Sequence, residues 1–197
     1  MDLQMKKILV DDHIWDFNLE AALNDISAQR KEQALKFKYE QGQRLCVLAY
    51  RLLKQGLREL YGIVENPVFT YNEHGKPSID GYPDIYFNLS HCGEAAVCAI
   101  NSQPIGIDVE SIREYRESLV HYTMNEAEID SIESSPNPAA AFIKLWTMKE
   151  ATLKLYGTGI NNNIKQVIDS SMISYTTIER TRYIYTVAEF HSHVGGF

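Results

Sequence analysis

Apolar side chains recur at steps of three and four residues early in the chain, and this spacing predicts a helical segment over residues 19–60. The helix is expected to close at Tyr61 and Gly62, because glycine readily ends a helix. Three short β-prone runs follow, separated by Gly, Pro and Asn: residues 67–71, 84–89 and 95–101. The first half is therefore predicted to be a long helix followed by an antiparallel sheet.

The second half begins after a turn at Pro104 and has the same coarse order. Its predicted elements are a strand, a polar helical stretch, a long helix and three β-rich segments: 105–109, 113–133, 138–156, 164–168, 173–179 and 182–190. Asn137 suits the N-cap of the long helix and Pro138 its first position, and Gly157 is expected to stop it.

This repeated order of helices and then strands predicts an α+β fold with a pseudo-two-fold arrangement of two similar halves. Each half would be a long helix packed on a small, mainly antiparallel sheet. The expected domains are residues 1–103 and residues 104–197, with the functional site between them. No residue-level repeat accompanies the coarse one.

The chain carries 19 Lys and Arg against 26 Asp and Glu, a net charge of -7. This balance excludes a long-range attraction to nucleic acid or to an anionic membrane, so any polyanion must bind at a local basic cluster. No apolar run approaches the ~20 residues needed to cross a bilayer, and no signal peptide is recognisable. The odd number of cysteines, Cys46, Cys92 and Cys98, fits reduced thiols in a cytoplasmic protein.

Two carboxylates in the predicted strand at 105–109 and its extension are the first candidates for chemistry. Asp108 and Glu110 lie two residues apart, so both face the same side of the strand, and Gly106 leaves room beside them. Neighbouring acids repel unless a cation lies between them, and a hard divalent cation with oxygen ligands is the usual solution. A solvated edge strand would explain the same pair.

A third acid and a lysine occur one helical turn apart in the predicted helix at 138–156. Glu150 and Lys154 would lie on one face, which also describes an ordinary surface ion pair. If Glu150 reaches Asp108 and Glu110, the three acids could hold a metal ion, and Lys154 could neutralise phosphate charge.

Four blocks give these residues a family context: Gly75-Lys76-Pro77, Phe87-Asn88-Leu89-Ser90-His91, Gly106-Ile107-Asp108, and Trp146-Thr147-Met148-Lys149-Glu150-Ala151 with Lys154. In this order and spacing they resemble the motifs of the 4′-phosphopantetheinyl transferase superfamily, in particular its surfactin-synthetase-activating type, the larger and monomeric branch. The likeness covers residues 75–154 and extends more faintly back to Lys31 and Arg44.

The resemblance implies that the protein transfers the 4′-phosphopantetheine arm of coenzyme A to a serine of an apo acyl or peptidyl carrier protein, releasing 3′,5′-ADP. Asp108, Glu110 and Glu150 would hold Mg²⁺, with Mn²⁺ not distinguished. Glu150 would also take the proton of the acceptor serine, and Lys154 would stabilise the pyrophosphate and the leaving group. A monomer is implied.

The resemblance also implies a basic cluster for the donor's ribose 3′-phosphate. The residues assigned to coenzyme A are Lys31, Arg44, Lys76, Ser90, His91 and Lys154. Relatives often carry a further basic residue where this chain has Ala28. Each assignment has a plainer alternative: solvated charges for Lys31 and Arg44, and structural side chains for the lysine and histidine of the motifs.

Supporting positions are Glu126 and Lys149, whose roles the sequence does not define. Basic and apolar residues, exemplified by Arg113, Arg116 and Met124, would form a docking surface for an acidic carrier protein, or else a solvated loop. Two other functions remain open: a non-catalytic binder of coenzyme A or carrier protein, and a metal-dependent hydrolase of a nucleotide pyrophosphate. The pathway that supplies the carrier is not readable from the sequence.

Overall fold

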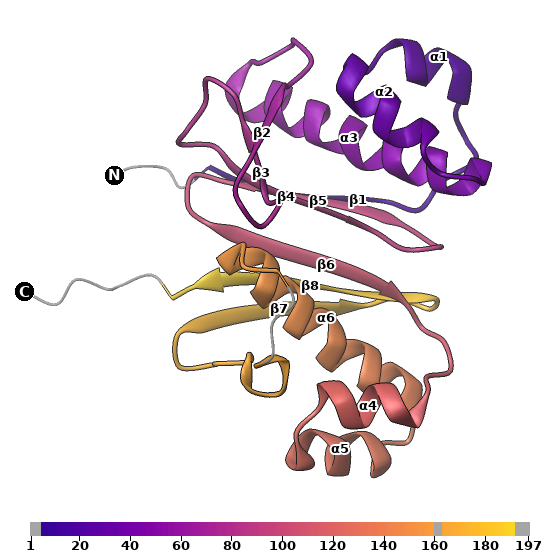
Figure 1. Ribbon diagram of the computed structural model, residues 1–197, viewed down its shortest axis with the longest axis vertical. Helices are drawn as coiled ribbons and strands as arrows, with labels where there is room; N and C mark the ends of the chain where they lie inside the picture. Colours follow the sequence, from indigo (N-terminus) through magenta and orange to yellow (C-terminus); the bar gives the residue numbers. More distant parts are fainter. Residues whose placement is uncertain (1–4, 160–162, 192–197) are drawn as a thin grey trace, which may run out of the picture.

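The computed structural model describes residues 5–159 and 163–191, arranged as two central sheets between two layers of helices (Figure 1). The elements of the first half are β1 (Lys6–Asp11), α1 (Leu19–Asn24), α2 (Ala28–Leu35), α3 (Glu40–Tyr61), β2 (Phe69–Tyr71), β3 (Pro77–Ile79), β4 (Tyr86–His91) and β5 (Ala96–Asn101). Those of the second half are β6 (Ile105–Ser111), α4 (Glu117–Thr123), α5 (Glu126–Glu133), α6 (Pro138–Tyr156), the short 3₁₀ helix η1 (Ile164–Gln166), β7 (Ile173–Glu179) and β8 (Tyr183–Phe190).

All strand pairs among the described residues are antiparallel. Each half contributes one three-stranded sheet, with strand orders β1-β5-β4 and β6-β8-β7, and β2 and β3 form a separate hairpin. The prediction of an α+β fold made of two similar halves with small antiparallel sheets is therefore confirmed. The turn between β5 and β6 lies at the expected boundary, and the division into two domains there stays a prediction.

The two sheets pack face to face, which explains why their inner strands are so apolar. All six side chains of β5 are buried, because α3 covers one face of this strand and the second sheet covers the other. Between the sheets, Val97 and Ala99 belong to the same apolar cluster as Ile107 and Val109 of β6. The alternate residues of β6 consequently point away from this core, towards α6.

Gly106 of β6 lets the strand approach α6 at backbone distance. A Cβ placed on Gly106 would lie 2.0 Å from the carbonyl oxygen of Ala151 and 2.7 Å from the amide nitrogen of Leu155. No larger residue fits without moving α6 away from the strand. The space that the sequence reserves beside Asp108 and Glu110 is thus filled by the helix that carries Glu150.

Several predicted element boundaries are wrong. The segment 19–60 is three helices, because the side chains of Asn18 and Ser27 cap α1 and α2 by accepting the amide hydrogens of Ala21 and Arg30. A capping box at Asn125 likewise begins α5 within the stretch expected to be continuous from 113 to 133. The strand expected at 164–168 is replaced by η1, and β1 and β3 are not among the predicted strands.

The predicted ends of α6 are confirmed. Asn137 accepts the amide hydrogen of Ala140, Pro138 is the first helical residue, and Gly157 ends the helix with φ of 72°. No helix in the described ranges is both long and apolar enough to span a membrane.

Candidate active site

Strand β6 and helix α6 carry the acidic residues that the sequence singles out. Asp108 and Glu110 follow Gly106 on the face of β6 that α6 covers, and Glu150 and Lys154 lie one turn apart on α6. Asp108 is 3% exposed, which is unusual for a carboxylate without compensating interactions.

Those interactions come from a serine and a lysine on two other elements. Asp108 Oδ1 accepts hydrogen bonds from Ser90 Oγ at 2.8 Å and from Lys154 Nζ at 2.6 Å. Lys154 Nζ also donates to Ser90 Oγ at 2.9 Å. The triangle joins β4 of the first half to β6 and α6 of the second, so both halves build the site.

The surroundings of the other two acids, Glu110 and Glu150, disfavour their charged forms. Burial, followed by the negative charge of Asp108, raises the pKa of Glu150 to about 7, although Lys154 partly offsets the shift. Burial and Asp108 also raise the pKa of Glu110, while Arg113 and a hydrogen bond from Trp146 oppose that rise. The site therefore has more negative charge than Lys154 neutralises.

Two carboxylate oxygens indicate that a cation fits here. Asp108 Oδ2 and Glu150 Oε1 are buried and lack a hydrogen-bond partner among the described residues. Carboxylate oxygens are the ligands that hard divalent cations prefer. The ligand atoms of Asp108, Glu110 and Glu150 nevertheless do not all lie within 4.8 Å of one another.

Only one group in the described part of the chain has that tighter spacing, namely Asp11, Asp12 and His13 at the end of β1. The side chain of His13 is 72% exposed, and its Nδ1 is 3.4 Å from an oxygen of each aspartate. Exposed acidic groups such as these are common in proteins without a bound metal ion.

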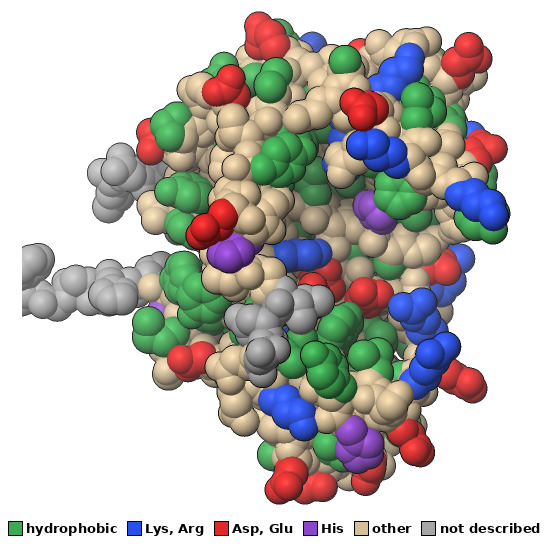
Figure 2. Space-filling model, in the orientation of Figure 1, with side chains coloured by type: hydrophobic (Ala, Val, Ile, Leu, Met, Phe, Trp, Pro, Cys, Tyr) green, Lys and Arg blue, Asp and Glu red, His purple; other side chains and the backbone are tan. Residues whose placement is uncertain are grey.

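A pocket of about 500 Å³ opens beside the acids, between the two halves. Five residues assigned to the site from the sequence line it: Lys76, Ser90, His91, Glu150 and Lys154. Figure 2 shows basic, acidic and histidine side chains gathered along the line where the upper and lower halves meet. The aromatic residues Phe69 and Tyr71 also line the cavity.

Burial favours the uncharged forms of His91 and Lys76. It lowers the pKa of His91 to about 4, helped by the positive charges of Arg30 and Lys154, so the imidazole is neutral at pH 7. Burial also lowers the pKa of Lys76, whose Nζ donates to the carbonyl oxygen of Leu155 at 2.9 Å. Lys76 thereby ties the β2–β3 turn to the end of α6.

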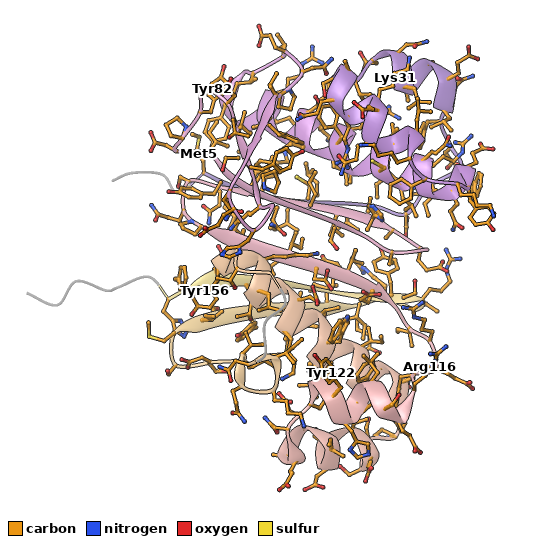
Figure 3. The ribbon with its side chains drawn as sticks, in the orientation of Figure 1. Met5, Lys31, Tyr82, Arg116, Tyr122 and Tyr156 are labelled. Carbon is orange, nitrogen blue, oxygen red and sulfur yellow. The ribbon has the colours of Figure 1, made fainter. Side chains whose placement is uncertain are left out.

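Lys31 and Arg44 do not line the pocket. Lys31 Nζ donates to Asn24 at 2.8 Å on the outer helical layer, where Figure 3 labels it. Arg44 Nη1 donates to the carbonyl oxygen of Phe17 at 2.8 Å, and its guanidinium stacks over Trp15. Both residues form hydrogen bonds to neighbouring segments of the first half. A role for them in binding coenzyme A stays a prediction.

Arg30 supplies a cation that the sequence does not single out. It lines the pocket with Gln33, three residues along α2, and is 8% exposed. Its Nε and Nη2 both donate to the carbonyl oxygen of Cys46, at 3.1 and 2.7 Å. Only one face of α2 can reach the cavity. Arg30 and Gln33 are three residues apart and therefore share a helix face, and this spacing is the sequence feature that could have identified Arg30.

A second hollow, of about 680 Å³, lies beyond Glu110. Arg113 and Arg116 line it, together with exposed apolar residues of α4 such as Tyr122. Figure 3 labels Arg116 and Tyr122. Met124 does not belong to this surface: it is fully buried against α5 and α6 because an unbranched apolar side chain fills the gap between them, so that prediction is wrong.

The two supporting residues lie outside the pocket lining. Glu126 is exposed in the first turn of α5. Lys149 is fully buried and forms an ion pair with Glu128, whose Oε1 lies 2.9 Å from Lys149 Nζ.

Comparisons with known proteins agree on one family. The family model described as the 4′-phosphopantetheinyl transferase superfamily matches residues 104–194. The 4′-phosphopantetheinyl transferase HetI of Nostoc sp. is 32% identical over 164 residues, covering 75% of this chain and 69% of the relative. The transferase gsp of Aneurinibacillus migulanus is 30% identical over 154 residues, covering 77% of this chain and 62% of the relative.

The 4′-phosphopantetheinyl transferase Sfp of Bacillus subtilis is 28% identical over 145 residues, covering 72% of this chain and 65% of the relative. The chain thus spans somewhat less than two thirds of the length of gsp and Sfp.

Proposed function

Because the chain belongs to the 4′-phosphopantetheinyl transferase superfamily, we propose that it transfers the 4′-phosphopantetheine arm of coenzyme A to a serine of an apo acyl or peptidyl carrier protein. The observation that carries the proposal is the bonded triangle of Ser90, Asp108 and Lys154, of which Ser90 and Lys154 line the pocket together with Glu150.

The pocket has the features that a molecule such as coenzyme A requires. Lys154 and Ser90 would bind the pyrophosphate at the acidic end, and Arg30, Lys76 and neutral His91 supply hydrogen-bond donors for phosphate oxygens along the cavity. Phe69 and Tyr71 in the same lining offer aromatic surface for a planar base. A volume of about 500 Å³ lies within the ordinary range for small-molecule sites.

In the proposed reaction, the oxygen of the carrier serine attacks the β-phosphorus of coenzyme A. A new oxygen–phosphorus bond forms to the serine, the bond to the bridging oxygen breaks, and 3′,5′-ADP leaves with that electron pair. Glu150, with a pKa of about 7, accepts the serine proton directly or through water. Lys154 neutralises charge on the pyrophosphate and the departing oxygen.

Asp108, Glu110 and Glu150 would hold Mg²⁺, and Mn²⁺ accepts the same oxygen ligands. When bound, the ion would neutralise negative charge on the pyrophosphate oxygens. The two orphaned oxygens of Asp108 and Glu150 and the raised pKa values of Glu110 and Glu150 support this assignment.

The carrier protein would dock on the hollow lined by α4 and the residues before it. Arg113 and Arg116 suit an acidic partner, and Tyr122 adds exposed apolar area. This hollow includes Glu110, so a carrier bound there would lie next to the acids. We also propose that the protein acts as a monomer and that it lies in the cytoplasm. The three free, buried cysteines support the second point, because free thiols are typical of a reducing compartment.

The proposal is tested by intact-mass measurement of several apo-carriers after incubation with the protein, coenzyme A and Mg²⁺. One carrier should gain the mass of a single phosphopantetheine arm, and Glu150→Gln should remove most of the turnover. No gain on any carrier, together with release of 3′,5′-ADP in their absence, would instead identify a hydrolase.

A further inference from the structure

Three threonine hydroxyls meet where α6 lies across the second sheet (Figure 1). Thr147 of α6 and Thr186 of β8 are fully buried, and their Oγ1 atoms lie 2.8 Å apart. Thr186 Oγ1 also lies 2.9 Å from Thr177 Oγ1 of β7. None of the three threonines lines either of the two hollows, so their hydroxyls serve contacts inside the protein.

The hydroxyl hydrogens of this cluster can be assigned, because each threonine has one to donate. Thr147 donates to the carbonyl oxygen of Lys144 at 2.9 Å, so Thr186 is the donor in its bond with Thr147. Thr186 in turn accepts from Thr177. A buried hydroxyl that lost its partner would cost free energy, since no water replaces the bond there. The cluster therefore favours one placement of Thr147 relative to Thr186.

The strand register brings this cluster next to the acidic site. Thr186 is the residue of β8 that pairs with Asp108 of β6, and Thr177 of β7 pairs with Thr186. Side chains at paired positions of antiparallel strands share a face of the sheet, so the three residues form one row across it. On α6, Thr147 lies three residues before Glu150, on the same side of the helix. The contact of Thr147 with this row is thus close to the point where the charge of Asp108 acts on Glu150.

Hydrogen bonding restrains α6 in a way that apolar packing does not. Ala151 of α6 shares an apolar cluster with Ala188 of β8, and such contacts depend little on direction. A hydrogen bond weakens steeply when its length or angle changes. Gly106 determines how closely α6 approaches the sheet, whereas the contact of Thr147 with Thr186 restrains the rotation of the helix about its axis.

The ion pair of Lys154 with Asp108, at 2.6 Å, also joins α6 to β6. In the proposed function, however, Lys154 binds the pyrophosphate, so this contact changes when the donor enters the pocket. The contact between Thr147 and Thr186 involves no residue assigned to the donor and is available with and without it. It can therefore hold the helix in both states.

We infer that Thr147 is a positioning residue of the acidic site. Its hydrogen bond with Thr186 fixes the rotation of α6, and this rotation determines how Glu150 is directed towards Asp108. Thr147 acts through the helix and is not itself a ligand. The inference rests on the proposed function in one respect, namely that the acids of the site hold a divalent ion.

Binding of Mn²⁺ in the presence of coenzyme A, followed by electron paramagnetic resonance, reports on the acids without turnover. The relevant Mn²⁺ is the ion whose binding Asp108→Asn abolishes. Thr147→Val keeps the shape of the side chain and removes its hydroxyl, and it should bind this ion roughly tenfold more weakly, as do other proteins that lose a residue orienting metal ligands. Thr147→Ser retains the hydroxyl and should restore most of the affinity. The kcat for transfer should follow the same order.

Thr177→Val is the matched control. It removes the hydrogen bond that the Thr186 hydroxyl accepts from β7 and leaves the contact with α6 intact. The melting temperature should fall in both valine variants, but Mn²⁺ affinity only in Thr147→Val. Thr186→Val breaks the same contact from the strand and serves as the test if Thr147→Val does not fold. Combining these two substitutions should weaken Mn²⁺ binding no further than Thr147→Val alone.

Three outcomes would count against these assignments. Native Mn²⁺ affinity in Thr147→Val would overturn the inference, and so would equal losses in Thr147→Val and Thr177→Val. The expected losses of Mn²⁺ affinity, in a protein that modifies no carrier, would support the inference and refute the proposed transfer alone. A native protein without any Mn²⁺ site that depends on Asp108 would overturn the inference together with the proposed metal site.

Discussion

At the scale of single residues, the half-buried imidazole of His91 gives the site a pH-dependent stability. Its pKa is about 4 in the folded protein against 6.5 in an unfolded chain. Between these values the unfolded state binds more protons, so stability falls as the pH is lowered from about 6.5 to about 4. The shift corresponds to about 3 kcal/mol at most.

His91→Asn should therefore flatten this part of the pH profile. Urea unfolding of both proteins between pH 4 and pH 7 measures the difference. His74, which also lines the pocket but has an exposed side chain, supplies the control: His74→Asn should retain the native slope. Equal slopes in the native protein and His91→Asn would show that the imidazole is not held neutral.

Single residues of the site were predictable where residue type and spacing are sufficient to identify them. Two acids at a spacing of two and an acid–lysine pair at a spacing of four are visible in any sequence, and the structure brings Asp108, Glu150 and Lys154 to one place. The basic residues were harder, because a lysine or arginine on a helix looks alike whether it faces a cavity or solvent. Arg30 reaches the pocket and Lys31 does not, although they are adjacent.

At the scale of elements, the contact of β6 with α6 fixes the distance between the acids. Gly106→Ala would place a methyl carbon 2.0 Å from the carbonyl oxygen of Ala151, so α6 must shift. We expect a loss of about 1–3 kcal/mol or more, with a large fall in activity, because Glu150 and Lys154 move with the helix. Urea unfolding and a transfer assay measure the two effects.

Gly93→Ala is the matched control for this substitution. The added carbon would meet only Ser111 Oγ, at 3.6 Å, which is an ordinary contact. A stable and fully active Gly106→Ala protein would contradict the close approach of strand and helix.

Element boundaries were predictable where neighbouring residues in the sequence specify a helix cap. Asn137, Pro138 and Gly157 define α6 in both sequence and structure. The break at Ser27 was missed because the apolar spacing of residues 19–60 continues across it, whereas the cap depends on one serine hydroxyl. Periodicity reports which face is buried and is insensitive to such interruptions.

At the scale of the whole molecule, Asn88 joins the two halves inside the core. This residue of β4 is 5% exposed, and its Oδ1 accepts the amide hydrogen of Ile107 in β6 at 3.3 Å. Asn88→Leu would leave that amide buried without its acceptor, at a cost of about 1–3 kcal/mol. Hydrogen exchange should show faster exchange of the Ile107 amide.

Tyr50→Phe provides the comparison, because it removes a buried hydrogen bond to Pro67 within the first half alone. It should lower stability without exposing Ile107. Unchanged protection of the Ile107 amide in Asn88→Leu would show that the halves are not joined in this way.

The coarse repeat of helices and strands was sufficient to predict two similar halves, but not how they meet. Contacts such as Lys76 with Leu155 and Asn72 with Gly157 join residues roughly eighty positions apart, and nothing local in the sequence specifies them. The pocket arises from those contacts, so its lining was predictable only where the family resemblance supplied the residues.

We propose that Asp108, Glu110 and Glu150 hold a divalent ion beside the pyrophosphate of coenzyme A. Phosphorus NMR of coenzyme A bound to the protein, with substoichiometric Mn²⁺ as a paramagnetic probe, tests it directly. Strong broadening of both pyrophosphate signals is expected in the native protein, and its loss is expected in a protein carrying Asp108→Asn and Glu150→Gln. Mn²⁺ that binds only at Asp11, Asp12 and His13, leaving the pyrophosphate signals sharp, would contradict the claim.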